Sequence, residues 1–242
     1  MNDRNPVLGL VHEYNSKGHL LHLEDFPGAF TRGETLDQAL GKIPAELARY
    51  HRWSGEDLHP HAVFNYRISR SKQSELAIED ADSDILFDSE KLPLSAKEYG
   101  ELKALVLKSA RDFLSLFSSI PDKDRQIKES RKTFYGELPA TASAMYQHTK
   151  NVNHYYFGEI GIPLSQNEDI FLGRKEGFLE LESRAAYLRN TVYKGGDGEL
   201  WSLRKALRRF IWHDAIHAKA MYRSASQVFP ESKIENPFCF NF

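Results

Sequence analysis

Hydrophobic residues follow two different periods along the chain. Short runs of β-forming residues occupy 7–14, 19–26 and 29–32, and turn signals at 15–18 and 27–28 separate them. From about residue 95 onward, apolar residues recur at every third or fourth position, which is the period of an amphipathic helix. The pattern predicts an α+β fold in which a small sheet precedes a set of long helices.

The first 70 residues predict a small sheet with one helix. After the three strands, Thr35 is suited to cap a helix that runs to about Trp53. Gly41 and Pro44 interrupt its apolar stripe, so we expect a bend there. A fourth strand is expected at 62–68. Residues 1–70 therefore read as one small α+β domain.

Residues 71–93 are acidic and lack a sustained period, with a cluster of carboxylates at 79–84. Such a cluster has two interpretations, a set of metal ligands or a solvated connection. The second is the more common, and we interpret 71–93 as an acidic linker.

Residues 94–242 predict four helices. The first begins at Ser95, which has capping-box spacing to Glu98, and ends before Pro121. The others are expected at about 138–161, 171–193 and from 199 onward, broken by glycine and proline. Four helices of ~20 residues, each with one apolar face, predict a four-helix bundle.

Two histidines interrupt the apolar stripe of the last helix. His213 and His217 are four residues apart and lie on one helix face, in register with Phe210 and Met221. A buried polar ring without a partner costs on the order of 1–3 kcal/mol. A facing helix or a metal ion should therefore satisfy both rings.

A third histidine, His148, falls on the apolar stripe of the second predicted helix. Together with His213 and His217 it could present three imidazole nitrogens to one divalent ion at ~2.0–2.1 Å and leave a position for water or substrate. The alternative is a set of hydrogen-bonded packing histidines. The remaining histidines receive no ligand role: His154 lies ~240° around the helix from His148, and the others are scattered over the small domain at His12, His19, His22, His51, His59 and His61.

Several neighbours of these histidines have two interpretations each. Asp214 is expected to support the site or to lie at the surface, and Tyr155 to line the site or to pack. Three arginines of the last helix could meet an anionic substrate or form a solvated face; they are Arg204, Arg208 and Arg209. The sequence assigns no catalytic residue.

Composition narrows the class of protein. Lys and Arg total 32 against 34 Asp and Glu, so the formal charge of −2 argues against a protein devoted to nucleic acid but leaves room for a local basic patch. No apolar run approaches the ~18 residues of a membrane span, and no signal peptide opens the chain, so we expect a cytoplasmic protein. Cys239, the one cysteine, is either an incidental thiol or a nucleophile.

Residues 21–40 resemble the HicB-like antitoxin fold. The matching features are Asp25-x-Pro27-Gly28, the aromatic Phe30, Thr31-x-Gly33-x-Thr35 and an alanine-containing helix. The resemblance implies a sheet-plus-helix unit that serves either a structural role or as a surface for a protein or nucleic acid.

Residues 95–229 resemble the DinB/YfiT-like family of four-helix-bundle metalloproteins. His148 matches its single histidine on the second helix, and His213 and His217 match its His-x-x-x-His on the last helix. The resemblance implies a three-histidine zinc or nickel ion completed by water, and transferase or isomerase chemistry on a small molecule with a low-molecular-weight thiol. The separation of 65 positions between His148 and His213 is short for the family, which leaves little chain for a lid. The alternative is a metal-stabilised scaffold without activity, and a homodimer stays open.

Overall fold

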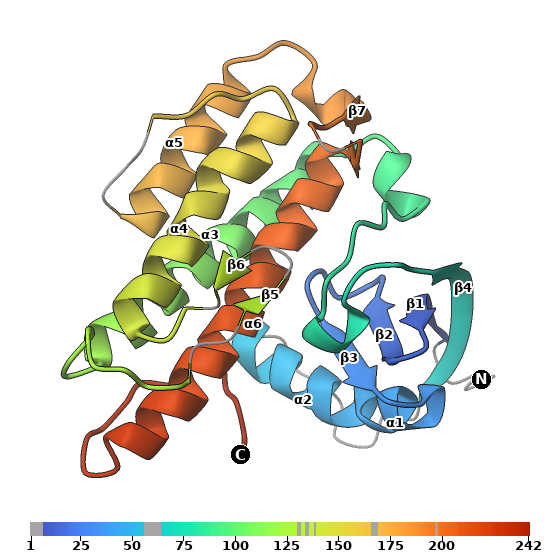
Figure 1. Cartoon of the computed structure of the whole chain (residues 1–242). Coiled ribbons are helices and arrows are strands. Elements are labelled where there is room, and N and C mark those ends of the chain that lie inside the picture. Colours follow the sequence, from blue (N-terminus) through green and yellow to red (C-terminus); the bar gives the residue numbers. More distant parts are fainter. Residues whose placement is uncertain are drawn as a thin grey trace.

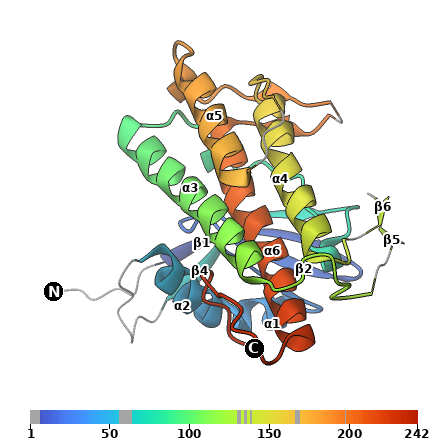
Figure 2. The same cartoon turned by 90° about the vertical axis from the view of Figure 1, so that its left-hand side faces the viewer.

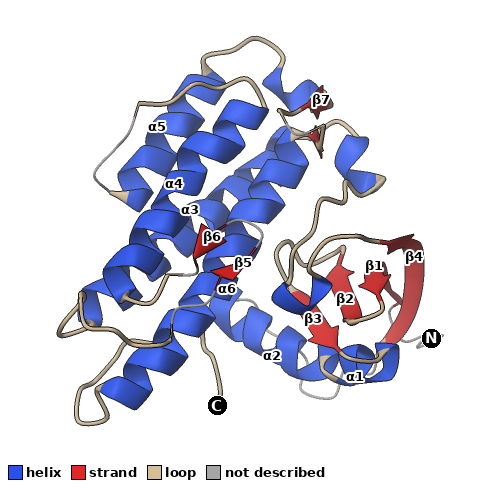
Figure 3. Ribbon diagram, viewed as in Figure 1, coloured by secondary structure: helices blue, strands red, loops and turns tan. Residues whose placement is uncertain are grey.

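The computed structural model describes residues 7–55, 64–129, 132–133, 136–137, 139–165, 169–196 and 198–242, with the backbone alone at 132–133 and 136–137. Figure 1 shows a sheet with two short helices beside a group of long helices, so the α+β class is confirmed. Colouring by secondary structure separates the two parts clearly (Figure 3). No helix in the described ranges is both long and apolar enough to cross a membrane.

The sheet has four strands in the order β3-β2-β1-β4. Strands β1 (Val7–Asn15), β2 (Gly18–Leu23) and β3 (Phe30–Gly33) form an antiparallel meander, which confirms the expected hairpin and third strand. Strand β4 (Asn65–Gln73) pairs in parallel with β1 and forms the sheet's edge within the described residues. The expected fourth strand thus begins later and runs further, and its first residues, 62–63, lie outside the described residues.

The single helix expected after the strands is two helices, α1 (Leu36–Gly41) and α2 (Ile43–Ser54). The Thr35 hydroxyl accepts a hydrogen bond from the Gln38 amide at 3.2 Å, as a helix cap should. The helix is interrupted at Lys42, because Pro44 has no amide hydrogen with which to continue the hydrogen bonds of α1. Pro44 is tolerated in the first turn of α2.

Four long helices pack side by side, as Figure 2 shows: α3 (Ala96–Ser119), α4 (Ala142–Glu159), α5 (Ile170–Glu182) and α6 (Leu203–Val228). The capping box of Ser95 and Glu98 at the start of α3 is confirmed. Helix α5 ends eleven residues before the expected position: the Arg184 amide already bonds to the Leu181 carbonyl, and Ala186 is left-handed, so the helical pattern does not continue. The short elements are η1 (Ile78–Asp80), η2 (Ser89–Lys91), β5 (Lys132–Thr133), β6 (Gly136–Glu137), η3 (Tyr187–Arg189), β7 (Tyr193–Lys194) and β8 (Leu200–Trp201).

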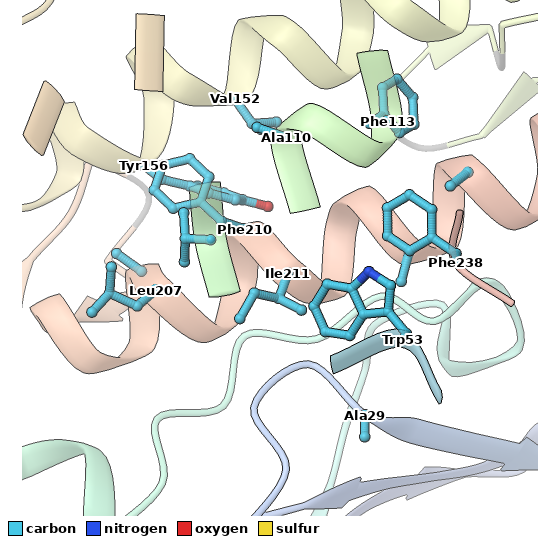
Figure 4. Close-up of a cluster of buried hydrophobic side chains, with 14 of the residues drawn as sticks. Ala29, Trp53, Ala110, Phe113, Val152, Tyr156, Leu207, Phe210, Ile211 and Phe238 are labelled. Atoms are coloured by element: carbon cyan, nitrogen blue, oxygen red, sulfur yellow. The ribbon is translucent and has the colours of Figure 1, made fainter. Parts of the chain in front are cut away.

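Helix α6 joins the sheet to the other helices. One side of it buries Phe210 against α3 and α4, whereas Ile211 faces the sheet and Trp53 of α2 (Figure 4). Helix α6 comes close to the sheet at Gly28, where a β-carbon would lie only 2.6 Å from Ile211 Cγ2. The φ of +87° at this position also favours glycine. The hydrophobic core is therefore continuous from the sheet to the long helices. The division into domains at residues 70 and 94 stays a prediction.

The segment expected to be a solvated linker is packed instead. Ile85 and Phe87 are buried with Val11 of β1. Glu90 is buried and accepts hydrogen bonds from Arg208 of α6. Of the acidic cluster, Asp84 is paired with Lys72. The expectation of a solvated connection was wrong because the cations of α6 bind the backbone and carboxylates of this segment.

Candidate metal centre

The three predicted histidines come together where α4 and α6 pack against each other. The two helices are antiparallel: His148 lies near His217 and His213, while Tyr156, eight residues later on α4, contacts Phe210. His213 and His217, one turn apart on α6, have ring centroids 4.3 Å apart. The antiparallel packing thus places one imidazole from α4 against two from α6.

Each histidine offers one ring nitrogen such that the three nitrogens lie within 4.8 Å of one another. The Nε2 atoms of His148 and His213 are 3.3 Å apart. Two ligands of a tetrahedral ion at ~2.0–2.1 Å would be separated by about 3.3 Å. This pair therefore already has the separation that a metal ion requires. Among the described residues this is the only group of three potential ligands so arranged.

The site lies at the edge of the helix packing and not inside the apolar core. His148 is exposed, and His213 and His217 are half-buried. The buried positions of α4 are neighbours of His148, such as Met145, Thr149 and Val152. The expectation that His148 points into the core was wrong: the buried face of α4 passes through Thr149, the next residue, and leaves His148 at its edge. The edge location leaves the rings within reach of a molecule from solvent.

The three imidazoles are neutral over the physiological range. Burial lowers the pKa of His217 to about 3, with a further contribution from His148 and Lys128. Burial, followed by the repulsion that protonated His217 and His148 would exert, holds the pKa of His213 well below its usual range. Burial and Lys128 also lower the pKa of His148. Neutral imidazole is the form that binds a metal ion, so the donor set fits one.

Asp214 does not support the histidines, contrary to one of the two expectations, nor does it lie at the surface. It is fully buried and forms an ion pair with Arg174 of α5, whose Nη1 donates to Asp214 Oδ2 at 2.5 Å. The Ser109 hydroxyl of α3 donates to the same oxygen at 2.6 Å. Arg174 Nε donates to Asn153 of α4 at 2.9 Å. This network ties all four long helices together beside the candidate site.

Sequence reasoning missed that network, although a signal for it exists. Arg174 lies between Ile170 and Phe178 at four-residue spacing, on the buried stripe of α5. A charged residue on an apolar stripe indicates a buried partner, in the same way as His213 and His217 do on α6.

The basic residues of α6 are buried, so the interpretation as a solvated face was wrong for Arg208 and Arg209. Arg208 pairs with Glu90 and stacks over the Phe87 ring. Arg209 donates to the Ser83 carbonyl and lies over the Trp212 ring at 4.6 Å. Arg204 is the most exposed of the three and reaches Glu98 and the Pro93 carbonyl.

The remaining candidates lie away from the three histidines. His154 is exposed, and its Nδ1 is 2.9 Å from the Leu164 carbonyl, as expected for a ring that faces elsewhere. Tyr155 packs against Trp201 and does not line the site. In the sheet, His12 Nε2 lies 2.9 Å from His19 Nδ1, and His22 Nε2 lies 3.2 Å from the Glu13 carboxylate. His59 and His61 lie outside the described residues.

No family model matches this chain, and neither a curated protein nor a solved structure shows significant similarity to it. The functional assignment therefore rests on the residues and their geometry.

Proposed function

We propose that this chain binds one divalent metal ion, zinc or nickel, through His148, His213 and His217. The proposal is carried by three neutral imidazoles from two antiparallel helices that converge within 4.8 Å. Three histidines leave at least one coordination position for water or substrate, which is typical of catalytic and not of closed structural sites. The edge location of the rings supports the same interpretation.

We further propose that the helical part is DinB/YfiT-like and the sheet HicB-like, and that the centre performs transferase or isomerase chemistry on a small molecule with a low-molecular-weight thiol. A bound ion would lower the pKa of a coordinated water or thiol and supply a nucleophile at neutral pH. The chain's own residues keep the three rings neutral through burial. The packing of four long helices supports the helical assignment, and the strand motif 25–35 supports the sheet assignment.

Metal content tests the first step. Purified protein, loaded with zinc or nickel and dialysed, should retain about one ion per chain by elemental analysis, and His213→Ala should retain none. His154→Ala is the matched control, since this histidine lies on α4 but is exposed and turned away. Wild-type protein without metal, or equal loss in both variants, would contradict the proposed site.

Turnover tests the second step. The metal-loaded protein should conjugate an electrophile such as monochlorobimane with a low-molecular-weight thiol faster than the uncatalysed reaction. The rate should drop to background in His213→Ala while circular dichroism shows an unchanged fold. A metal-bound protein that accelerates no thiol reaction would favour the scaffold over the enzyme.

A second candidate function is favoured by strand β4. It is nine residues long, lies at the sheet edge, and exposes Tyr66 and Ile68 by 37% and 39%. An edge strand can pair with an extended segment of another protein. Arg67 is exposed and has no charged partner among the described side chains, which favours an acidic segment.

The test for this second function needs the full chain. The sheet shares its core with Ile211 and Phe238, so removal of residues after Pro93 would expose that core. Arg67→Glu with Ile68→Lys should abolish binding of an acidic extended peptide in a fluorescence titration. Arg52→Glu, an exposed change on α2, is the control. Binding of DNA or RNA that the β4 changes abolish would instead indicate a nucleic-acid surface.

A further inference from the structure

A buried cation, Arg209, lies near His213 on α6. Arg209 precedes His213 by four residues on α6, so both side chains leave the same helix face, about 6 Å apart along the axis. On α4, Tyr156 has its ring 6.1 Å from that of His213 and 5.6 Å from Arg209 Cζ. Arg209 and Tyr156 therefore continue the strip that carries the histidines.

Two hydrogen-bond donors in this region lack acceptors. Arg209 is 9% exposed and Trp212 is 3% exposed, and their side chains stack. Arg209 Nε and Trp212 Nε1 are buried without a hydrogen-bond partner among the described residues. Both groups can donate and neither can accept. A buried donor without an acceptor costs on the order of 1–3 kcal/mol, so an oxygen placed here would be bound favourably.

The surrounding charge favours an anion as well. Arg209 is a buried cation one helical turn from His213. The one carboxylate next to the histidines in sequence, Asp214, is already paired with Arg174. Although burial opposes it, Tyr156, Glu199 and Asp82 raise the pKa of Arg209, so the guanidinium stays charged. A divalent ion would add two further positive charges.

We infer that the metal centre takes a small molecule with two functional ends, a donor atom that binds the ion and a carboxylate or similar oxyanion that accepts hydrogen bonds from Arg209 and Trp212. The inference rests on the proposed metal site. The molecule is short, because Arg209 and His213 are only one helical turn apart; about four bonds between the donor atom and the oxyanion oxygen match that spacing. The substrate or cosubstrate is thus a short anionic thiol and not a neutral one.

Two ligands of equal length test this directly. In 3-mercaptopropionate and in 3-mercaptopropan-1-ol, four bonds join the sulfur to the terminal oxygen, and only the first carries a charge there. Each is titrated into cobalt-loaded protein and followed by the cobalt–thiolate absorption. The wild-type protein should bind the carboxylate about tenfold more tightly than the alcohol, the ratio that one charge-assisted hydrogen bond provides.

Arg209→Gln should bring this ratio close to one while cobalt content stays at the wild-type level. Arg204→Gln, at the more exposed arginine of the same helix, should keep the tenfold preference. If wild-type protein binds the two thiols with equal affinity, the subsite is refuted, and this result does not depend on whether a variant folds. A preference for the carboxylate that persists in Arg209→Gln would also refute it. A wild-type protein that takes up no cobalt would refute the metal site, and the subsite with it.

Discussion

The buried ion pair between Arg174 and Asp214 should dominate the response to a single isosteric change. Asp214→Asn preserves the shape of the side chain but removes its charge. In the native protein Asp214 Oδ2 accepts from Arg174 Nη1 at 2.5 Å and Oδ1 accepts from Arg174 Nη2 at 3.1 Å, and both side chains are fully buried. The asparagine would leave the guanidinium buried without its counter-charge and would turn an amide donor toward it.

The expected loss is about 3–5 kcal/mol of unfolding free energy, the cost of an uncompensated buried charge. That is a large share of the roughly 5–15 kcal/mol by which folded domains are stable. Arg174→Met combined with Asp214→Leu removes both charges at similar volume and should cost less than the single change. Part of the cost remains in the double variant, because Asn153 and Ser109 lose the partners that they have in the network.

Urea denaturation of chelator-treated protein, followed by circular dichroism, measures these changes without a contribution from bound metal. The wild-type protein, Arg174→Met, Asp214→Leu and the double variant form a cycle that gives a coupling energy for the pair. A loss below about 1 kcal/mol for Asp214→Asn, or a double variant that loses the sum of both single changes, would refute the role of the pair as a charge-compensated clamp.

Three further predictions concern packing, pH and metal. Gly177→Ala should lower the unfolding free energy by about 1–3 kcal/mol, because the new β-carbon would lie 2.2 Å from Phe157 Cε2. Gly100→Ala, at an exposed position of α3, should instead raise it by about 0.5–1 kcal/mol. Melting temperatures that shift in the same direction in both variants would contradict this. Burial lowers the pKa of Lys205 from 10.5 to about 8, so between these pH values the unfolded chain binds more protons than the folded one. The unfolding free energy should therefore rise by about 3 kcal/mol as the pH rises from 8 to 10.5. Lys205→Met should abolish that rise. Zinc at 100 times its dissociation constant should stabilise the protein by about 2.7 kcal/mol, and a zinc effect that persists in His217→Ala would place the ion elsewhere.

Local signals in the sequence predicted most of the secondary structure. Thr35 and the pair Ser95 and Glu98 marked helix starts that the structure confirms, because capping depends on neighbours within one turn. The approach of His148 to His213 and His217 also followed from periodicity, once two helices were expected to face each other. Their role as ligands stays a prediction.

Tertiary partners decided the features that the sequence did not reveal. Lys205, Arg208 and Arg209 have the spacing of a solvated helix face, yet carbonyls and carboxylates of the segment 83–90 bury them. No local pattern in the acidic segment indicates that it packs on α6, since its partners lie about 120 residues away. The edge position of His148 was missed for a related reason, because a helical period locates an apolar stripe only to within one residue.

The dependence of the sheet on α6 has a consequence for how the chain folds. Gly28 packs against Ile211, and His22 of β2 lies against Trp212, so the sheet is covered by residues that follow it by more than 180 positions. During synthesis the strands leave the ribosome long before α6 does, and the entropy of closing so long a loop must be met before these contacts form. We expect the sheet to remain partly exposed, with the apolar face around Gly28 and His22 open to aggregation, until the last helix covers it.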